Sequence, residues 1–574
     1  MQNMQSSNHR LRGDILLLLF WIILGLILRF TNLAEKSPSS TEISTLGFSL
    51  GNGFLGVPLN QLISLDTLLS PLQFTQNTNT GDVIDRLMSE SNHPPLYFIL
   101  THFWLQLLSQ PGDIVSLEMG RSLSAILGTM AIPAIFCLSL LAFQSRHVSH
   151  ISAALMTVSP YAIYLSQEAR HYTLTILWLI ASLACLVLAA KSIYQQKLLP
   201  AWVGCSWVIV NGLGMATHYF FSLALCAEGL VIAGLWLRDC YLGQKKYLSK
   251  NNPFNFALRG SWWRIYGIAI GTAIACLVWL PVLLHIPNTD LAQWNGELET
   301  SYELGEIWQP LPRFLAWWIT MVFLLPVEGV NTVIIIISAL VILAVLLWVI
   351  PGIIRGFRYQ IQTESSCLSL QVLGGFVISA IFIFLVIIYG LGKDLSLAAR
   401  YHFVYFPALI TVLGVTLAPV WNQNIKPFGK KIVIVVLLLG FLGSLTVIYN
   451  YGYQKSRRSD LLVNDIQTYS EKPAVIAMTY NTHAELRALI GLGVEFQRQA
   501  STVTQNTQFL LIQDNTNYPQ IKTLTNQLNS IQQPLDLWAV NLKIDREQIE
   551  ALNCLRDEDK PKINGYRVRL YHCS

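Results

Sequence analysis

The chain has 574 residues, of which 53% are apolar and 12% are charged, and its mean hydropathy is +0.46. Soluble domains carry about 25% charged residues, so this composition excludes an ordinary soluble protein. The net charge of +5 is small and gathers on no basic face suited to nucleic acid. Repeated apolar runs of about 20 residues predict an α-helical polytopic membrane protein.

Eleven apolar runs are predicted to span the membrane. The first follows Arg10 and Arg12, and it is too long for a signal peptide and lacks a small-residue cleavage site. The expected spans cover residues 14–33, 119–143, 149–166, 172–190, 198–216, 219–237, 265–286, 331–351, 368–391, 402–420 and 431–450. Residues 94–110 and 314–325 are predicted to form helices that lie along the membrane interface.

The charges of the connections predict the orientation. With the N-terminus in the cytoplasm, the inner connections hold the basic residues, including six in the loop 238–264. The outer connections are then the acidic segments 34–93 and 287–313. This asymmetry follows the positive-inside rule. It places the protein in the cytoplasmic membrane, with the first outer loop (34–118) and all residues after 450 outside the cytoplasm.

From about residue 451 the composition becomes that of a soluble domain. Strand patterns at 474–480, 509–513, 535–541 and 566–572 alternate with helical patterns at 483–496, 518–531 and 546–555. This alternation predicts a small parallel-type α/β sheet. Residues 451–574 are therefore expected to form an extracytoplasmic α/β domain, after a transmembrane core formed by residues 1–450.

Nine cysteines are present, and no two of them form a Cys-x-x-Cys motif. Seven lie in or beside apolar runs, where packing is the simplest interpretation. Cys554 and Cys573 lie in the polar tail. Because the tail is expected to face an oxidising compartment, we predict a disulfide between them.

The densest polar motif lies between two apolar runs and contains Glu168, Arg170, His171 and Tyr172. If this stretch is helical, Glu168 faces the same side as His171 and Tyr172. Charges near a bilayer are costly, so such a motif favours a function. The alternative is a solvated loop with a snorkelling arginine.

Two polar motifs belong to the first outer loop. Glu42 follows the first span, and His93 and Tyr97 flank two prolines at the start of the run 94–110. Glu42 is a candidate site residue, although a helix-capping role would explain it equally well. His93 is a candidate ligand-binding residue, although it could equally be a solvated cap.

A further polar motif contains Lys393, Arg400 and Tyr401, at the predicted outer end of the tenth span. Arginine and tyrosine are also common anchors at a membrane interface. His218 and His285 are weaker candidates at outer ends of other spans.

Together these motifs predict an outward-facing site for a lipid phosphate. Arginine and lysine would hold the phosphate at the interface, with the lipid tail in the bilayer. A carboxylate would accept a proton from an attacking hydroxyl.

The motifs occur in an order that resembles the GT-C glycosyltransferases, such as the protein O-mannosyltransferases and the lipid A aminoarabinose transferase. The resemblance covers about residues 10–450 and rests on the acidic loop after span one, His-Pro-Pro-Leu-Tyr from His93, Arg-Ser-Leu-Ser-Ala from Arg121, Ser-Gln-Glu-Ala-Arg-His-Tyr from Ser166, and Arg400-Tyr401. It implies a polyprenyl-phosphate sugar donor, transfer with inversion, and a site on the non-cytoplasmic face.

By this resemblance, Glu42 falls on the second acid of the family's Asp-Glu pair, and Glu168 on the acid of its second outer loop. The first acid of the pair is replaced here by Thr41. The base role therefore passes to Glu42 or Glu168, or the chain is a non-catalytic member. If the two acids share one cavity, at least one carboxyl pKa should be raised. Arg170 and Arg400 would neutralise the departing phosphate.

Two alternatives to the enzyme remain open from the sequence: a transporter or flippase of a lipid-linked glycan, and a non-catalytic member of the family. Polar groups at one membrane face, without a twofold pattern of spans, favour the enzyme over a transporter. No Asp-x-Asp motif or His/Cys ligand set predicts a metal, but scattered carboxylates leave a divalent cation open. The partners expected are the donor lipid, membrane lipids and an acceptor that the sequence does not identify.

Overall fold

The structure is a computed structural model that describes residues 2–246, 262–285, 307–422, 429–499, 507–514, 520–531, 534–557, 563 and 565–574. The chain divides into two compact units. The first contains Met1–Thr31, Asn92–Tyr97 and Ser122–Tyr453, and the second contains Asn32–Ser91, Phe98–Arg121 and Gln454–Ser574. Most of the basic loop expected at 238–264 and of the acidic loop expected at 287–313 lies outside the described residues.

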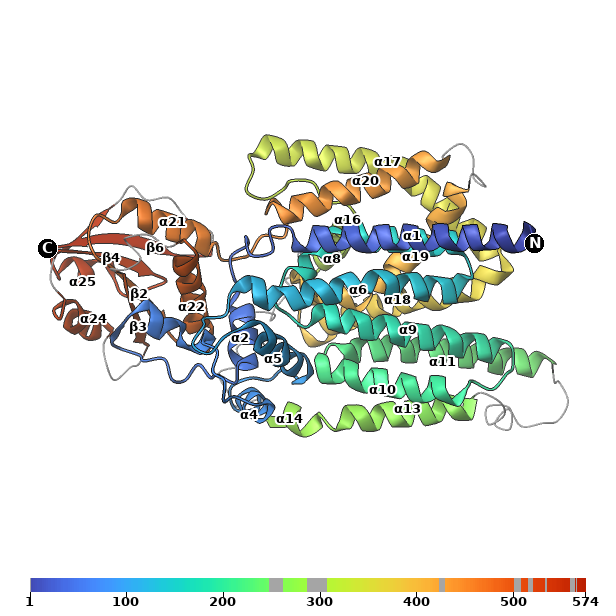
Figure 1. The fold of residues 1–574 in the computed structure, drawn as a ribbon, viewed down its shortest axis with the longest axis horizontal. Coiled ribbons are helices and arrows are strands. Elements are labelled where there is room, and N and C mark those ends of the chain that lie inside the picture. Colours follow the sequence, from blue (N-terminus) through green and yellow to red (C-terminus); the bar gives the residue numbers. More distant parts are fainter. Residues whose placement is uncertain are drawn as a thin grey trace. The chain divides into compact units, whose positions relative to one another are not determined.

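The first unit is a bundle of long apolar helices (Figure 1). Its helices are α1 (Gln2–Phe30), α7 (Arg146–Val158), α8 (Pro160–Ser166), α9 (Tyr172–Tyr194), α10 (Ala201–Thr217), α11 (Phe221–Lys246), α13 (Trp262–Leu277), α14 (Leu280–His285), α16 (Pro310–Val322), α17 (Thr332–Gln362), α18 (Glu364–Leu391), α19 (Phe406–Trp421) and α20 (Gly429–Ile448), with the 3-10 helices η4 (Leu395–Leu397) and η5 (Ala399–Val404). Two helices, α5 (Leu96–Leu108) and α6 (Leu117–Phe143), contribute residues to both units.

Each of the eleven predicted spans coincides with one or more described apolar helices, although not all of these helices are long enough to cross a membrane. In the described part of the chain, eight helices are long and apolar enough to cross a membrane, and α7 with α8 makes a ninth if this bent pair is one span. The two remaining predictions, 198–216 and 402–420, coincide with the shorter apolar helices α10 and α19. The segments predicted to lie at the interface form α5 and α16, and their interfacial position stays a prediction.

The third predicted span is broken between α7 and α8, whose axes differ by 57°. The break follows from Ser159 and Pro160, because proline has no N–H to continue the helical hydrogen bonds. The Ser159 hydroxyl accepts a hydrogen bond from the N–H of Ala162 and so caps α8. The carbonyl of Val158, at the end of α7, accepts a hydrogen bond from the hydroxyl of Ser444 in α20, at 2.9 Å.

A buried arginine of α1 supplies donors to the same break. Arg29 is fully buried, and its guanidinium donates to the carbonyls of Met156 (3.0 Å) and Thr157 (3.4 Å), in the last turn of α7. These carbonyls belong to the orphan acceptors that every helix end leaves. Gln167, just after α8, donates in turn to the carbonyl of Thr31 at 2.9 Å. The end of α1 is therefore tied to the end of α7 and to the residue that follows α8.

The second unit is built on a mixed six-stranded sheet with the order β1-β3-β2-β4-β6-β5. The strands are β1 (Leu62–Ile63), β2 (Ala474–Tyr480), β3 (Gln508–Gln513), β4 (Leu535–Val540), β5 (Cys554–Asp557) and β6 (Val568–Cys573). Strand β2 pairs in parallel with β3 and β4, whereas β1, β5 and β6 pair antiparallel with their neighbours. The expectation of a parallel-type sheet is therefore correct only for its three central strands.

Helices cover both faces of this sheet. Leu524 and Leu528 of α24 (Gln520–Leu528) pack on the face that contains Val475 and Leu510. Helix α22 (His483–Arg498) packs on the other face, where its Phe496 contacts Phe509. The remaining helices of the unit are α2 (Ser40–Ser49), α3 (Leu65–Leu69), η1 (Ser70–Leu72), α4 (Thr80–Glu90), α21 (Ser459–Tyr469) and α25 (Arg546–Glu550).

Two details of this unit differ from the sequence predictions. The helix predicted at 546–555 ends at Glu550, because Asn553 adopts a left-handed backbone (φ 59°) and the chain then enters β5. The edge strand β1 comes from the first outer loop, and its two residues carry no strand signal of their own.

The disulfide between Cys554 and Cys573 is confirmed, and it joins the paired strands β5 and β6.

Removing this disulfide should destabilise the second unit. The bridge closes a loop with a sequence separation of 19 residues, for which the loop-entropy estimate is about 3 kcal/mol. We expect the double variant Cys554→Ser/Cys573→Ser to lose about this much unfolding free energy in denaturant titrations of the purified protein. The matched control is Cys205→Ser, at a free cysteine, which should change it little. Labelling of both thiols in denatured, unreduced wild type would contradict the bridge.

Candidate active site

The predicted site residues fall into the two units. Glu42 lies in the second unit, in the first turn of α2. Glu168, Arg170, His171, Tyr172, His93, Tyr97, Lys393, Arg400 and Tyr401 all lie in the first unit. Each group is described within its own unit.

Glu42 is a helix-capping residue, as its alternative interpretation proposed. The Ser39 hydroxyl accepts a hydrogen bond from the Glu42 N–H, and the Glu42 carboxylate accepts one from the Ser39 N–H at 3.0 Å. This reciprocal arrangement is a capping box. Thr41, the residue before Glu42, places its hydroxyl 3.0 Å from that of Ser39.

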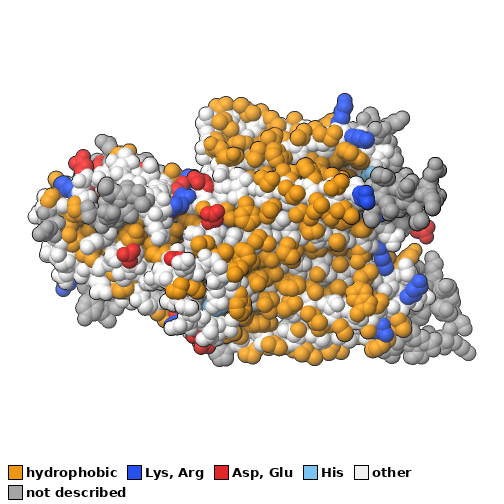
Figure 2. Space-filling view, viewed as in Figure 1, with side chains coloured by type: hydrophobic (Ala, Val, Ile, Leu, Met, Phe, Trp, Pro, Cys, Tyr) orange, Lys and Arg blue, Asp and Glu red, His pale blue; other side chains and the backbone are white. Residues whose placement is uncertain are grey.

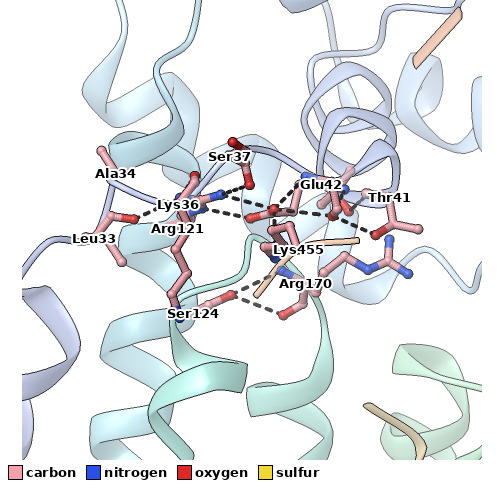
Figure 3. A network of polar contacts seen from close by, with 12 residues as sticks. Leu33, Ala34, Lys36, Ser37, Thr41, Glu42, Arg121, Ser124, Arg170 and Lys455 are labelled. Carbon is pink, nitrogen blue, oxygen red and sulfur yellow. Dashed lines mark hydrogen bonds and ion pairs between the residues drawn. The ribbon is translucent and has the colours of Figure 1, made fainter. Parts of the chain in front are cut away.

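The Glu42 carboxylate also forms a buried ion cluster (Figure 3). Arg121, in the first turns of α6, donates to both of its oxygens, at 2.8 and 3.1 Å. Lys455 lies 3.2 Å from one of them. The same guanidinium donates to the carbonyls of Leu33 (3.0 Å) and Lys36 (2.8 Å), so Arg121 ties the chain after α1 to α2 and α6.

These contacts favour a structural role for Glu42 over the role of a base. Burial alone would raise the pKa of its carboxyl, but Arg121 and Lys455 outweigh burial and hold the pKa well below its usual value. The pKa of Glu42 is therefore lowered, so Glu42 is not the carboxyl with a raised pKa that was expected if the two acids share one cavity. A general base needs a pKa not far from the working pH. The sequence signal for this cluster was Arg121 itself, a charge at the start of a predicted span.

In the first unit, the segment that contains Glu168 is not helical, contrary to the conditional expectation. Helix α8 ends at Ser166 and α9 begins at Tyr172, so residues 167–171 form a turn. Within it, the N–H of Arg170 donates to the carbonyl of Glu168 at 2.7 Å. The break at Pro160 makes α8 short, and the turn follows at its end. All five residues from Gln167 to His171 are buried.

The turn is held against α6 and the start of α5. The hydroxyl of Ser124, in α6, donates to the carbonyl of Arg170 at 3.1 Å (Figure 3). The same hydroxyl lies 2.7 Å from that of Tyr97. The guanidinium of Arg170 lies 3.4 Å from Nε2 of His93. The structure therefore brings together His93, Tyr97 and Arg170, as the sequence predicted.

His171 lies at the centre of a group of histidine and tyrosine rings. Its ring is 4.2 Å from that of His218, 4.8 Å from Tyr172 and 5.5 Å from His93. Burial, followed by the nearby His218 and Arg170, lowers the pKa of His171 well below its usual value. Burial also lowers the pKa of His218, to about 3. The sequence placed His218 among the weaker candidates, because one histidine at a helix end has no distinctive spacing.

His171 is fully buried, and neither of its ring nitrogens has a hydrogen-bond partner among the described residues. Buried polar side chains are nearly always hydrogen-bonded to protein or ordered water. These two nitrogens, which lie beside an arginine, therefore need a partner that the described residues do not supply, either an ordered water or a ligand.

Arg400 brings a second guanidinium to this group, from η5. Its guanidinium carbon lies 5.4 Å from the Tyr401 ring centroid, as Arg170 lies over Tyr172 at 5.8 Å. Tyr164, in α8, is close enough to interact electrostatically with both Glu168 and Arg400. Two arginines, three histidines and a carboxylate thus converge at one end of the bundle.

The segment that follows α18 also contributes a buried acid, Asp394, which was not among the candidate site residues. The left-handed Gly392 ends α18 (φ 65°), and Lys393 follows it. The buried Asp394 forms an ion pair with Arg313 of α16 at 2.6 Å and accepts two hydrogen bonds from Ser396. This acid therefore holds α16 against the chain that leads to Arg400.

Throughout the described ranges, no group of three or more His, Cys, Asp or Glu side chains has an arrangement that could hold a metal ion. The cationic group around His171 is suited instead to an anion, because guanidinium groups bind phosphate through charge-assisted hydrogen bonds.

Comparison with solved structures identifies the fold. ArnT from Cupriavidus metallidurans bound to undecaprenyl phosphate matches with a TM-score of 0.51 and 10% identity, over 96% of this chain and 97% of that one. Its apo state gives a TM-score of 0.50 at the same identity and coverage. The chain therefore shares the fold of these ArnT structures.

The oligosaccharyltransferase of Archaeoglobus fulgidus also matches, with a TM-score of 0.43 and 13% identity over 84% of this chain and 63% of that one, a likeness too weak to support a conclusion. In sequence comparisons, no family profile matches the chain and no curated protein does.

The ion cluster of Glu42 predicts a pH-dependent stability. A carboxyl whose pKa is lowered in the folded state stabilises the fold above its unfolded pKa, near 4.5, and loses this contribution as the pH falls below that value. We expect Glu42→Gln to cost about 3–5 kcal/mol at pH 7, because it leaves Arg121 buried with a weakened partner. Thermal unfolding from pH 7 to pH 3 measures both effects.

The matched control is Glu35→Gln in the same connection, because the side chain of Glu35 is 66% exposed. This variant should unfold like the wild type at pH 7. Equal stability of Glu42→Gln and Glu35→Gln would contradict a structural role for the cluster.

Proposed function

We propose that this protein transfers a sugar from a polyprenyl-phosphate-linked donor to an acceptor hydroxyl on the outer face of the cytoplasmic membrane. The observation that carries the proposal is the buried cationic group of the first unit. Arg170 and Arg400 lie with the unsatisfied ring nitrogens of His171 at one end of an apolar helix bundle. An anionic phosphate would accept hydrogen bonds from the two guanidinium groups and from the protonated ring nitrogen of His171, and its lipid tail would lie along the apolar helices.

The fold supports a lipid-phosphate donor. The ArnT structure with the same fold was determined with undecaprenyl phosphate bound. At 10% identity the likeness carries no residue roles, so the roles proposed for this chain rest on its own geometry. Neither the likeness to ArnT nor the geometry of this chain identifies the sugar. Neither of them shows whether the acceptor is a lipid, a glycan or a protein.

Glu168 is the proposed base. Glu168 is buried, with 7% of its surface exposed, and it lies in the same turn as Arg170. Its carboxylate would take the proton of the acceptor hydroxyl as the hydroxyl oxygen attacks the anomeric carbon. The bond from that carbon to the phosphate oxygen breaks on the opposite side, which inverts the configuration. The electron pair of the broken bond leaves with the polyprenyl phosphate.

Arg170 and Arg400 would stabilise the departing phosphate. Charge that develops on the phosphate oxygens in the transition state is best stabilised by donors that are already in place, and this is commonly the largest catalytic contribution of a protein. Tyr172 and Tyr401 lie beside these guanidinium groups and would help to hold them. His93, Tyr97 and His171 would bind the donor, and Lys393 would add positive charge near the phosphate.

Glu42 is proposed to act as a positioning residue in place of a base. Its contacts with Arg121, Lys455 and Ser39 use both carboxylate oxygens. The first acid of the family's pair is Thr41 here, and its hydroxyl is a far weaker base than a carboxylate. Together these features leave Glu168 as the base of the proposed reaction.

Substitution of Glu168 should abolish most of the transfer. We expect Glu168→Gln to reduce turnover by at least about 100-fold, the lower end for loss of a general base, because the amide keeps the shape of the side chain and cannot accept the proton. The assay is transfer of labelled sugar from polyprenyl phosphate by purified protein. The matched control is Glu364→Gln, at the exposed start of α18, which should keep the wild-type rate.

In the same assay, Arg400→Ala should weaken donor binding and turnover together, because it removes a partner of the phosphate. Near wild-type turnover of Glu168→Gln would place the base elsewhere. If wild type transfers no sugar from any donor but moves a glycolipid across vesicles, the protein is a transporter or flippase. If it does neither, it is a non-catalytic member of the fold.

The proposed orientation can be measured separately from activity. A reporter fused after Lys250 should report the cytoplasm, and one fused after Ser574 should report the outside, because basic connections remain inside. A fusion after Gln110, beyond α5, should also report the outside. Reporters after Lys250 and Ser574 on the same side would contradict the predicted count of eleven spans.

A further inference from the structure

A groove lies between α17 and α19 in the first unit, away from the site described above. Its volume is about 400 Å³, and its walls are mainly apolar, with Ile353, Ile354 and Phe357 on α17 and Leu413 on α19. Ile354 and Phe357 are exposed on the surface of the bundle. The groove therefore opens where lipid surrounds a membrane protein.

The groove is at the opposite end of the bundle from the cationic group of Arg170 and Arg400. It occupies the last ten residues of α17, which Thr363 joins directly to the start of α18. Helix α18 has 28 residues, so it is about 42 Å long at 1.5 Å per residue. The chain reaches Arg400 only after the far end of α18. The groove is thus separate from the proposed donor site.

The shape of the groove is set by a close helix crossing at Gly356. A Cβ atom at this position would lie 1.9 Å from the carbonyl oxygen of Thr416, so the backbones of α17 and α19 approach too closely for any other residue. One turn further along α17, the Gln360 amide donates to the carbonyl of Val415 at 3.1 Å. These contacts hold the two walls of the groove at a fixed spacing.

One wall of the groove carries a cation. Arg358 lines the groove and is exposed, and the structure records no hydrogen bond or ion pair for it with any described residue. Arg355 lies one turn earlier on the same helix, outside the groove lining. Lys and Arg side chains are visible at the end of the bundle where the N-terminus lies (Figure 2). An exposed guanidinium beside an apolar groove matches a ligand with an anionic head and an apolar tail.

We propose that this groove binds one anionic phospholipid, with its headgroup phosphate on Arg358 and an acyl chain against the apolar wall. Basic pockets between membrane helices are known to hold anionic headgroups. A zwitterionic lipid offers the same phosphate, but its ammonium group offsets the attraction of the guanidinium. Free phosphate would leave the apolar wall uncovered. The lipid would stabilise the pairing of α17 with α19, because a ligand that binds only the folded state stabilises it.

The test compares lipid retention by purified, full-length variants. The protein is reconstituted with equal amounts of phosphatidylglycerol and phosphatidylethanolamine, extracted in mild detergent and examined by native mass spectrometry. Wild type should retain one phosphatidylglycerol in preference to phosphatidylethanolamine. Arg358→Ala should reduce that preference about fivefold, the usual effect of one basic residue at an anionic surface. Leu413→Trp, which fills the groove and keeps every charge, should reduce retention of both lipids.

The matched control is Arg355→Ala, which removes the same charge one turn away and should change the preference less than twofold. An equal loss in the two arginine variants would overturn the proposal, because the effect would then be that of general surface charge. Equal retention of the two lipids by wild type would overturn it as well. If added polyprenyl phosphate displaces phosphatidylglycerol, the groove is a carrier site and the assigned occupant is wrong.

Discussion

The break between α7 and α8 is the constraint on which the first unit depends. Pro160 cannot donate a hydrogen bond, so the carbonyls in the last turn of α7 need partners from elsewhere. An unsatisfied buried acceptor costs about 1–3 kcal/mol. Arg29 of α1 and Ser444 of α20 supply the donors. This need ties two neighbouring helices, α1 and α20, to the break, after which the short α8 leads to the turn of Glu168.

The two units use buried charge in different ways. In the second unit, the charge of Glu42 is balanced by Arg121 and Lys455, and its oxygens are occupied. Such a cluster fixes the chain path and leaves little to offer a ligand. In the first unit, Arg170 and Arg400 lie among histidines whose pKa values are lowered, so these rings are neutral near pH 7. A phosphate that binds there would accept hydrogen bonds from the two guanidinium groups, and its negative charge would raise the pKa of the histidine rings.

The likeness to ArnT covers nearly all of both chains, but the sequence identity is very low. A membrane fold of this kind depends on the lengths and breaks of apolar helices, and many different apolar residues satisfy that need. Site chemistry depends on single side chains, which such a likeness does not carry. The local contacts of each residue must therefore decide its role.

The sequence determined the features that arise from local pattern. Apolar run length predicted the helices, alternation predicted β2, β3 and β4, and the two tail cysteines predicted the disulfide. Most of the polar residues that lie together in the first unit were also singled out from the sequence, because charges at the ends of apolar helices are rare. Their neighbour His218 was undervalued, since a single histidine carries no periodic signal.

Only the tertiary structure decided which groups neutralise one another. Glu42 and Glu168 look alike in the sequence, as single acids near helix ends. Arg121 is 79 residues from Glu42 along the chain, and Lys455 is more than 400 residues away. Strand β1 likewise pairs with β3 across most of the chain. The charge state of a carboxyl and the pairing of an edge strand depend on neighbours in space, and no local pattern of residues specifies these.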